Sequence, residues 1–132
     1  MKQLTAMLAV VAVVAVATLG SQTAHAQQRS LLSKTDITGV AGKEGVVLVV
    51  TIPAGLVGAK HFHPGDEFLY ILEGELTLET EGKAPVTLKP GETLHIPGKA
   101  IHQARNPSAT TPAKVLTFGV FEKGLPDTTV VK

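Results

Sequence analysis

Residues 55–74, GLVGAKHFHPGDEFLYILEG, contain two histidines and a glutamate in close succession: His61, His63 and Glu67. In an extended strand, residues i and i+2 point to the same face, so we expect both imidazoles to point the same way. Residues 64–66 favour a turn, because Pro fixes φ and Gly tolerates positive φ. Glu67 can then return beside the imidazoles. Two nitrogens and one carboxylate oxygen suit a borderline divalent metal ion, so this stretch predicts a metal site.

A second stretch, residues 91–106, reads GETLHIPGKAIHQARN and supplies His102 as a fourth candidate ligand. The first stretch has the form G-x5-H-x-H-x3-E-x6-G, and the second has the form G-x5-P-x4-H-x3-N. In this order they resemble the two sequence motifs of the cupin superfamily, and the resemblance covers about residues 45–121. The second stretch departs from the family motif at one position, which leaves the shape of the local turn open. Lys99 stands where the family usually has Gly, and Gly98 comes one residue early.

The resemblance implies a small, single-domain, type-2-like cupin with an all-β fold, the double-stranded β-helix or jelly-roll barrel. It also implies one divalent transition metal per chain, held by His61, His63, Glu67 and His102. Fe or Mn is favoured, and Zn, Ni, Co and Cu are the alternatives. The function stays open at this point, because one fold carries many chemistries.

The pattern of apolar residues supports the same fold class independently. Residues 46–52, VVLVVTI, read as a strand buried on both faces, and residues 75–81 alternate apolar and polar side chains. Short strands separated by Gly and Pro turns, without a helical period after Ala26, predict an all-β sandwich or barrel.

The N-terminus predicts export. Lys2 precedes an apolar run over residues 7–19, and a small-x-small pattern ends at Ala26. These features predict a signal peptide over residues 1–26, with cleavage after Ala26 and a periplasmic or secreted protein that has no membrane contact thereafter. An uncleaved anchor is the alternative. We expect an N-terminal segment or edge strand over 27–44, the barrel over 45–121, and a C-terminal tail over 122–132.

Composition excludes several classes of partner and site. The sequence has no cysteine, which excludes disulfides and thiolate metal ligands. Loss of the leader removes Lys2 and leaves equal numbers of acidic and basic residues, so nucleic acid is not expected as a partner. A small-molecule ligand or substrate is the expected partner.

The predicted pocket is apolar, and no general acid or base stands out, so the catalytic residues are unknown. The expected lining has no inward Lys, Arg or second carboxylate; it comprises Leu69, Ile71, Leu76, Leu78, Ala104 and Phe118. This pattern favours an exported metal-dependent oxygenase acting on a small apolar or aromatic molecule. The alternative is a cupin that binds a metal or small molecule without turnover, as a sensor, store or structural site. A metal-free scaffold is a third class.

The strand that starts at Glu67 is apolar on both faces, which indicates a second copy of the chain. If Glu67 points inward, an apolar row faces outward and is expected to be buried against a partner: Phe68, Tyr70 and Leu72. Cupin relatives often pair through their sheets, so we expect a homodimer. His95 is out of phase with Leu94 and Ile96, and we expect it to face a subunit contact or solvent.

Overall fold

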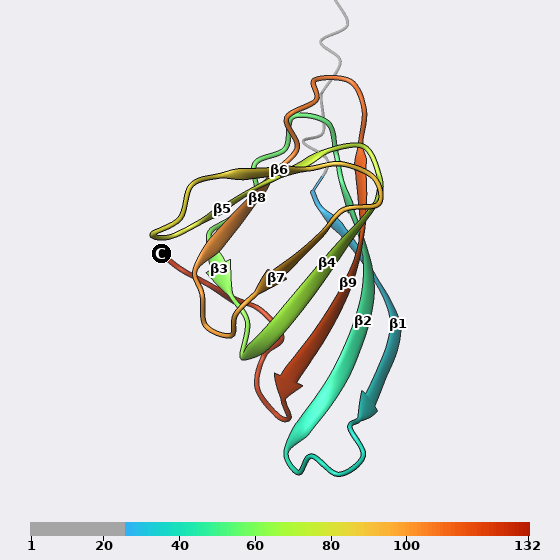
Figure 1. The fold of residues 1–132 in the computed structure, drawn as a ribbon, viewed down its shortest axis with the longest axis vertical. Coiled ribbons are helices and arrows are strands. Elements are labelled where there is room, and N and C mark those ends of the chain that lie inside the picture. Colours follow the sequence, from blue (N-terminus) through green and yellow to red (C-terminus); the bar gives the residue numbers. More distant parts are fainter. Residues whose placement is uncertain (1–25) are drawn as a thin grey trace, which may run out of the picture.

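The computed structural model describes residues 26–132, so the predicted signal peptide, which ends at Ala26, falls almost entirely outside the described residues. Across 26–132 the chain forms ten strands (Figure 1). They are β1 Gln28–Asp36, β2 Lys43–Ile52, β3 His61–Phe62, β4 Gly65–Glu73, β5 Leu76–Thr80, β6 Val86–Leu88, β7 Thr93–Ile96, β8 His102–Arg105, β9 Ala113–Glu122 and β10 Thr129–Val130. In this part of the chain, no helix is long and apolar enough to span a membrane.

The strands build two five-stranded antiparallel sheets. One has the order β1-β2-β9-β4-β7, and the other has the order β10-β3-β8-β5-β6. The β5-β6 and β8 strands face the β4-β9-β2 layer across the interior (Figure 1). This two-layer architecture confirms the predicted all-β jelly roll.

The core lies between the two sheets because β2, β4 and β9 alternate more and less buried side chains along their lengths. β2 and β9 pair along their whole lengths, from Lys43–Glu122 to Ile52–Ala113. The buried apolar residues come from both sheets: Val46, Leu48, Val50, Ile52, Leu69, Ile71, Leu76, Leu78, Leu88, Ile96, Ala113, Val115 and Phe121.

The same alternation corrects one expected pocket residue. On β9 the inward positions are Val115, Thr117 and Phe121, whereas Phe118 is 41% exposed and lies on the outer face. There it packs beside Phe68 of the neighbouring strand, with ring centroids 6.4 Å apart. Phe118 therefore extends the outward apolar row instead of lining the pocket.

The two ends of the described chain are tied into the sheets. The N-terminal segment forms the edge strand β1, which pairs with β2 and is exposed along its whole length. The segment expected to be a C-terminal tail contains β10, which pairs with β3 through Thr129–Phe62 and Val130–His61. The C-terminal segment thus pairs directly with β3, the strand that carries His61.

Candidate metal centre

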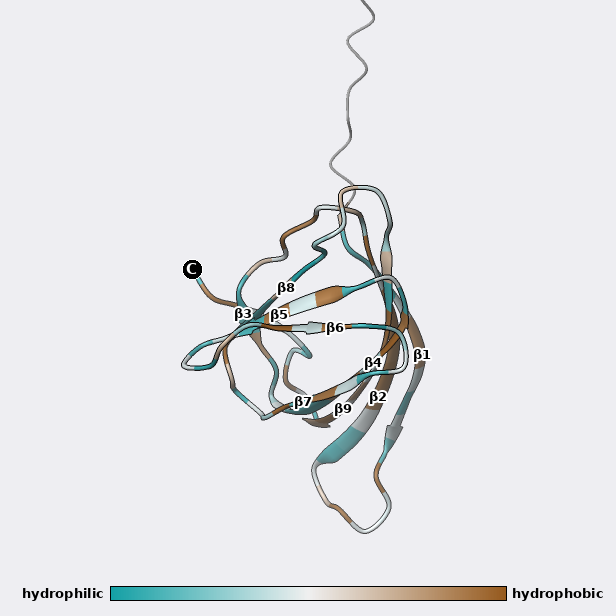
Figure 2. Ribbon diagram, turned by 45° about the horizontal axis from the view of Figure 1, so that its top comes forward, coloured by the Kyte–Doolittle hydropathy of each residue, from teal (hydrophilic) through white to brown (hydrophobic). Residues whose placement is uncertain are grey.

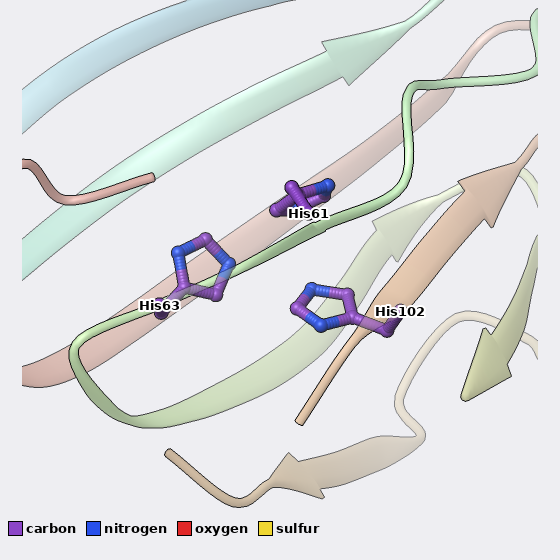
Figure 3. Close-up of side chains that lie close together, drawn as sticks. All are labelled: His61, His63 and His102. Atoms are coloured by element: carbon purple, nitrogen blue, oxygen red, sulfur yellow. The ribbon is translucent and has the colours of Figure 1, made fainter. Parts of the chain in front are cut away.

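Three histidines converge between the sheets (Figure 3). His61 and His102 are direct partners of the β3–β8 ladder, so their side chains share a face of the sheet. His63 follows β3 and is almost fully buried. One ring nitrogen from each of His61, His63 and His102 lies within 4.8 Å of the others.

Backbone carbonyls fix the orientation of each imidazole. The Nδ1 atom is hydrogen-bonded to Ala59 O in His61 (2.8 Å), to Asp127 O in His63 and to Ala100 O in His102 (2.9 Å). A carbonyl oxygen can only accept a hydrogen bond, so each Nδ1 carries a proton. In a neutral imidazole the lone pair then lies on Nε2, which is the arrangement that a metal-binding histidine requires.

Glu67, on β4 of the opposite sheet, completes the set of four expected ligands. Its Oε2 lies 3.1 Å from His63 Nε2 and 4.0 Å from His102 Nε2, and its side chain is buried. A carboxylate and a proton-free imidazole nitrogen are both electron-pair donors, so this close approach requires a proton or a cation between them. The donor set of three nitrogens and one oxygen fits a divalent transition metal and excludes a calcium-type oxygen cage.

The pKa shifts agree with this geometry. Burial lowers the pKa of His102 to about 4, and burial also lowers the pKa of His61, so both rings stay neutral at ordinary pH. Burial acts in the same direction on His63, but its hydrogen bond to the Glu67 carboxylate, the negative charge of Glu67 and the Asp127 carbonyl raise its pKa overall. Without a metal, the raised pKa of His63 and its 3.1 Å approach to the Glu67 carboxylate both favour a proton on this ring.

Phe121 holds His63 in place from the β9 side. The two rings stack with centroids 5.4 Å apart and an angle of 16° between planes. A Cβ atom at Gly119 would lie 2.1 Å from the Phe121 ring, so only glycine leaves room for this ring to fold back over its own strand. Phe121 was not among the residues that the sequence singled out for the site.

A pocket with a cavity volume of about 80 Å³ opens beside the histidines, which is room for a small molecule only. Four of the expected lining residues contribute to its wall: Leu69, Leu76, Leu78 and Ala104. Ile71 is fully buried but packs in the core away from this wall. Thr117 lines it where Phe118 was expected.

The rim of the pocket is polar, contrary to the expectation of a lining without Lys or Arg. Gln27 and Arg29 come from the N-terminal segment, and Thr128 comes from the segment expected to be a tail. Arg29 Nη1 donates a hydrogen bond to Thr128 Oγ1 (3.1 Å). The sequence gives no local sign of this arrangement, because it joins two residues from opposite ends of the fold.

Three other polar residues have structural positions away from the pocket. His95 is exposed, stacks on Phe68 at 4.8 Å and lies 3.5 Å from Asp66, so it faces outward as expected. Tyr70 is exposed on the outer face. Asn106 is buried and donates from Nδ2 to Ile52 O (3.1 Å) and Thr111 O (2.8 Å), which anchors the turn after β8.

Comparison with known proteins identifies the family. A family model described as "Cupin domain" matches residues 48–119. The chain belongs to the cupin family. The motif resemblance in the sequence is thereby confirmed, together with the double-stranded β-helix that cupins share.

Two curated cupins are similar in sequence over part of their length. Dimethylsulfoniopropionate lyase DddQ of Ruegeria pomeroyi is 38% identical over 74 residues, covering 56% of this chain and 37% of that protein. Quercetin 2,3-dioxygenase of Bacillus subtilis is 36% identical over 83 residues, covering 60% of this chain and 24% of that protein. The chain thus spans well under half the length of either relative.

Solved structures show the same fold. The crystal structure of DddQ from Ruegeria pomeroyi superposes with a TM-score of 0.66 at 25% identity, covering 86% of this chain and 56% of that one. A cupin-like protein of Thermotoga maritima gives a TM-score of 0.64 at 22% identity, covering 80% and 75% of the two chains.

Proposed function

We propose that this cupin binds one divalent transition metal through His61, His63, Glu67 and His102, with Fe or Mn as the native ion. The observation that carries the proposal is the set of three Nδ1–carbonyl hydrogen bonds, which leaves three Nε2 lone pairs beside the Glu67 carboxylate. An ion that takes five or six ligands keeps one or two coordination positions beyond the four protein ligands, and a substrate or dioxygen can occupy them.

We further propose that the protein is an oxygenase acting on a small, largely apolar or aromatic molecule. When bound, Fe or Mn supplies the redox chemistry, while the chain supplies the buried ligands and the apolar wall of Leu69, Leu76 and Leu78. Similarity to quercetin 2,3-dioxygenase supports this reaction class, and the small cavity favours a substrate much smaller than a flavonol.

Binding without turnover is the second candidate. One observation favours it: within residues 26–132, the titratable side chains lining the pocket are the four ligands and Arg29, none of them free to act as a general acid or base near neutral pH. A sensor, store or structural site needs no such group.

Metal content and oxygen uptake separate these functions. Protein from its native compartment is analysed by elemental mass spectrometry beside a His61→Ala, His102→Ala double variant. We expect about one Fe or Mn per chain, lost in the variant, and substrate-dependent oxygen consumption by the Fe-loaded protein with small phenols and short-chain acids. Stoichiometric zinc without oxygen uptake would favour the binding role. Little metal even after reloading would overturn both proposals.

We also propose that the protein is exported and cleaved after Ala26. Gln27 would then become the N-terminal residue, and it lies at the rim of the pocket. Mass spectrometry of the mature protein tests the cleavage point. A chain that retains residues 1–26 would overturn this proposal.

The proposed assembly is a homodimer formed through the β1-β2-β9-β4-β7 sheet. The outer face of this sheet presents four exposed apolar side chains: Phe68, Tyr70, Leu72 and Phe118. β1 is an edge strand, and its free edge offers unpaired backbone groups to a second copy. Figure 2 shows hydrophobic colouring over much of β2, β4 and β9, the central strands of this sheet, with a hydrophilic start to β2.

A further inference from the structure

The polar rim of the pocket differs in character from its interior. The wall is formed mainly by aliphatic side chains, and the floor holds the four expected ligands. The rim carries Gln27 and Arg29, from the start of β1, and Thr128, from the residue before β10. A molecule in the pocket would therefore meet the metal site at one end and these polar groups at the other.

Arg29 is held at the rim by a single side-chain hydrogen bond to another residue of 26–132. Its guanidinium group has five N–H donors, and the described contacts include one hydrogen bond, from Nη1 to Thr128 Oγ1. Arg105 pairs with Glu79 at 3.5 Å, whereas Arg29 forms no ion pair with a carboxylate of residues 26–132. Thr128 Oγ1 also lies 3.5 Å from His63 Nδ1, so this contact ties Arg29 to the metal site.

The charge balance of the site favours an anionic ligand. A divalent ion with three neutral imidazoles and the Glu67 carboxylate leaves one net positive charge, and Arg29 adds a second. Arg29 lies close to the histidines, because Thr128 Oγ1 accepts its hydrogen bond (3.1 Å) and lies 3.5 Å from His63 Nδ1. Within residues 26–132, the pocket lining contains no carboxylate besides Glu67 to offset these charges.

We propose that Arg29 is a specificity-determining residue that binds the carboxylate of a small substrate at the rim of the pocket. The planar guanidinium offers two parallel N–H donors that match the two oxygens of a carboxylate. The apolar part of the substrate then lies against Leu76, Leu78 and Ala104, and its far end lies beside the metal ligands. This inference rests on the proposed metal site and narrows its substrate class to short monocarboxylates.

Calorimetric titration of propionate and its neutral analogue propionamide tests the proposal, using both Mn-loaded and metal-free protein. In the Mn-loaded wild type, propionate should bind more tightly than propionamide. Arg29→Gln should weaken propionate binding by about tenfold to a hundredfold and leave propionamide unchanged, because one charge-assisted contact is lost. Arg29→Lys should give an intermediate loss. Arg105→Gln, a surface variant away from the pocket, is the matched control and should bind like the wild type.

The outcomes distinguish this proposal from the proposed metal site. Normal Mn content in Arg29→Gln, with loss of the preference for the carboxylate, supports the role of Arg29. Unchanged propionate binding in Arg29→Gln, equal loss of both probes, or no propionate binding to the wild type overturns it while leaving the metal site intact. Failure of the wild type to bind Mn overturns the metal site instead, and the metal-free titrations then still report on Arg29.

Discussion

Lys99 donates its backbone N–H to the carbonyl oxygen of His63 (2.9 Å) while holding a φ of +63°. A side chain in this left-handed region costs about 1–2 kcal/mol, whereas glycine adopts it freely. Lys99 occupies the position where cupin sequences usually have Gly, so the turn keeps its shape at an energetic cost. We predict that Lys99→Gly raises the free energy of unfolding by up to about 1 kcal/mol, measured by urea denaturation, with unchanged metal content.

Gly98 provides the control for that prediction. A Cβ atom at Gly98 would lie 3.0 Å from the Cα atom of Gly65, so the two backbones need glycine for their close approach. Gly98→Ala should therefore destabilise the protein, although the residue is adjacent to Lys99. If Lys99→Gly proved neutral or destabilising, the strain assigned to Lys99 would be wrong.

Glu67 should contribute to metal binding directly. Glu67→Gln keeps the size of the side chain but removes its negative charge, and the amide is a much weaker metal ligand. We expect the metal dissociation constant to rise by roughly tenfold or more, measured by competition with a chromophoric chelator. Glu79→Gln, on an exposed carboxylate that pairs with Arg105, is the matched control. Equal affinities in the two variants would remove Glu67 from the ligand set.

Acid should destabilise the metal-free protein through His102. Its folded-state pKa is about 4, below the ordinary value of 6.5, so between these values the unfolded chain binds a proton that the folded chain does not. The contribution of His102 to stability is therefore present above pH 6.5 and is lost as pH falls toward 4. The pKa of His61 is shifted in the same direction. The pKa of His63 is raised, so the contribution of His63 to stability is present below its ordinary pKa and is lost as pH rises through the raised pKa.

The measurement compares melting temperatures of chelator-treated wild type and His102→Gln across this range. We expect the wild type to lose more stability than the variant on acidification from pH 6.5, since the variant lacks the titrating ring. The difference between the two proteins cancels the titration of groups distant from His102. Parallel curves would contradict the assigned pKa of His102.

The proximity of His61, His63 and Glu67 could be predicted from sequence because it is local, whereas His102 came from the second stretch, which resembles a cupin motif. The spacing of His61 and His63 follows from the two-residue period of an extended chain, and a short turn returns Glu67 to them. The middle of β9 is apolar on both faces, and the sign that Phe118 points outward comes only from the ends of the strand, where Lys114 and Glu122 share its face. The rim was also inaccessible to pattern reasoning, since Arg29 and Thr128 are 99 positions apart.

The outward aromatic residues should control dimerisation. Phe68 is 44% exposed, lies beside Phe118 and stacks on His95, at the centre of the outer face. Size-exclusion chromatography with light scattering should give a dimer for the wild type at micromolar concentration. Phe68→Glu should weaken the dimer by roughly thirtyfold or more, because each subunit loses an apolar contact and gains a charge at the interface.

Val86 supplies the matched control, since it is similarly exposed but lies on β6 of the opposite sheet. Val86→Glu should remain dimeric, because its surface is outside the proposed interface. A wild-type monomer at micromolar concentration would overturn the interface and leave the apolar row without an assigned partner. Leu32→Pro, in β1, tests the alternative interface at the free strand edge, because proline disrupts edge pairing. If the dimer survives Phe68→Glu but dissociates in Leu32→Pro, the interface lies at this edge and not on the sheet face.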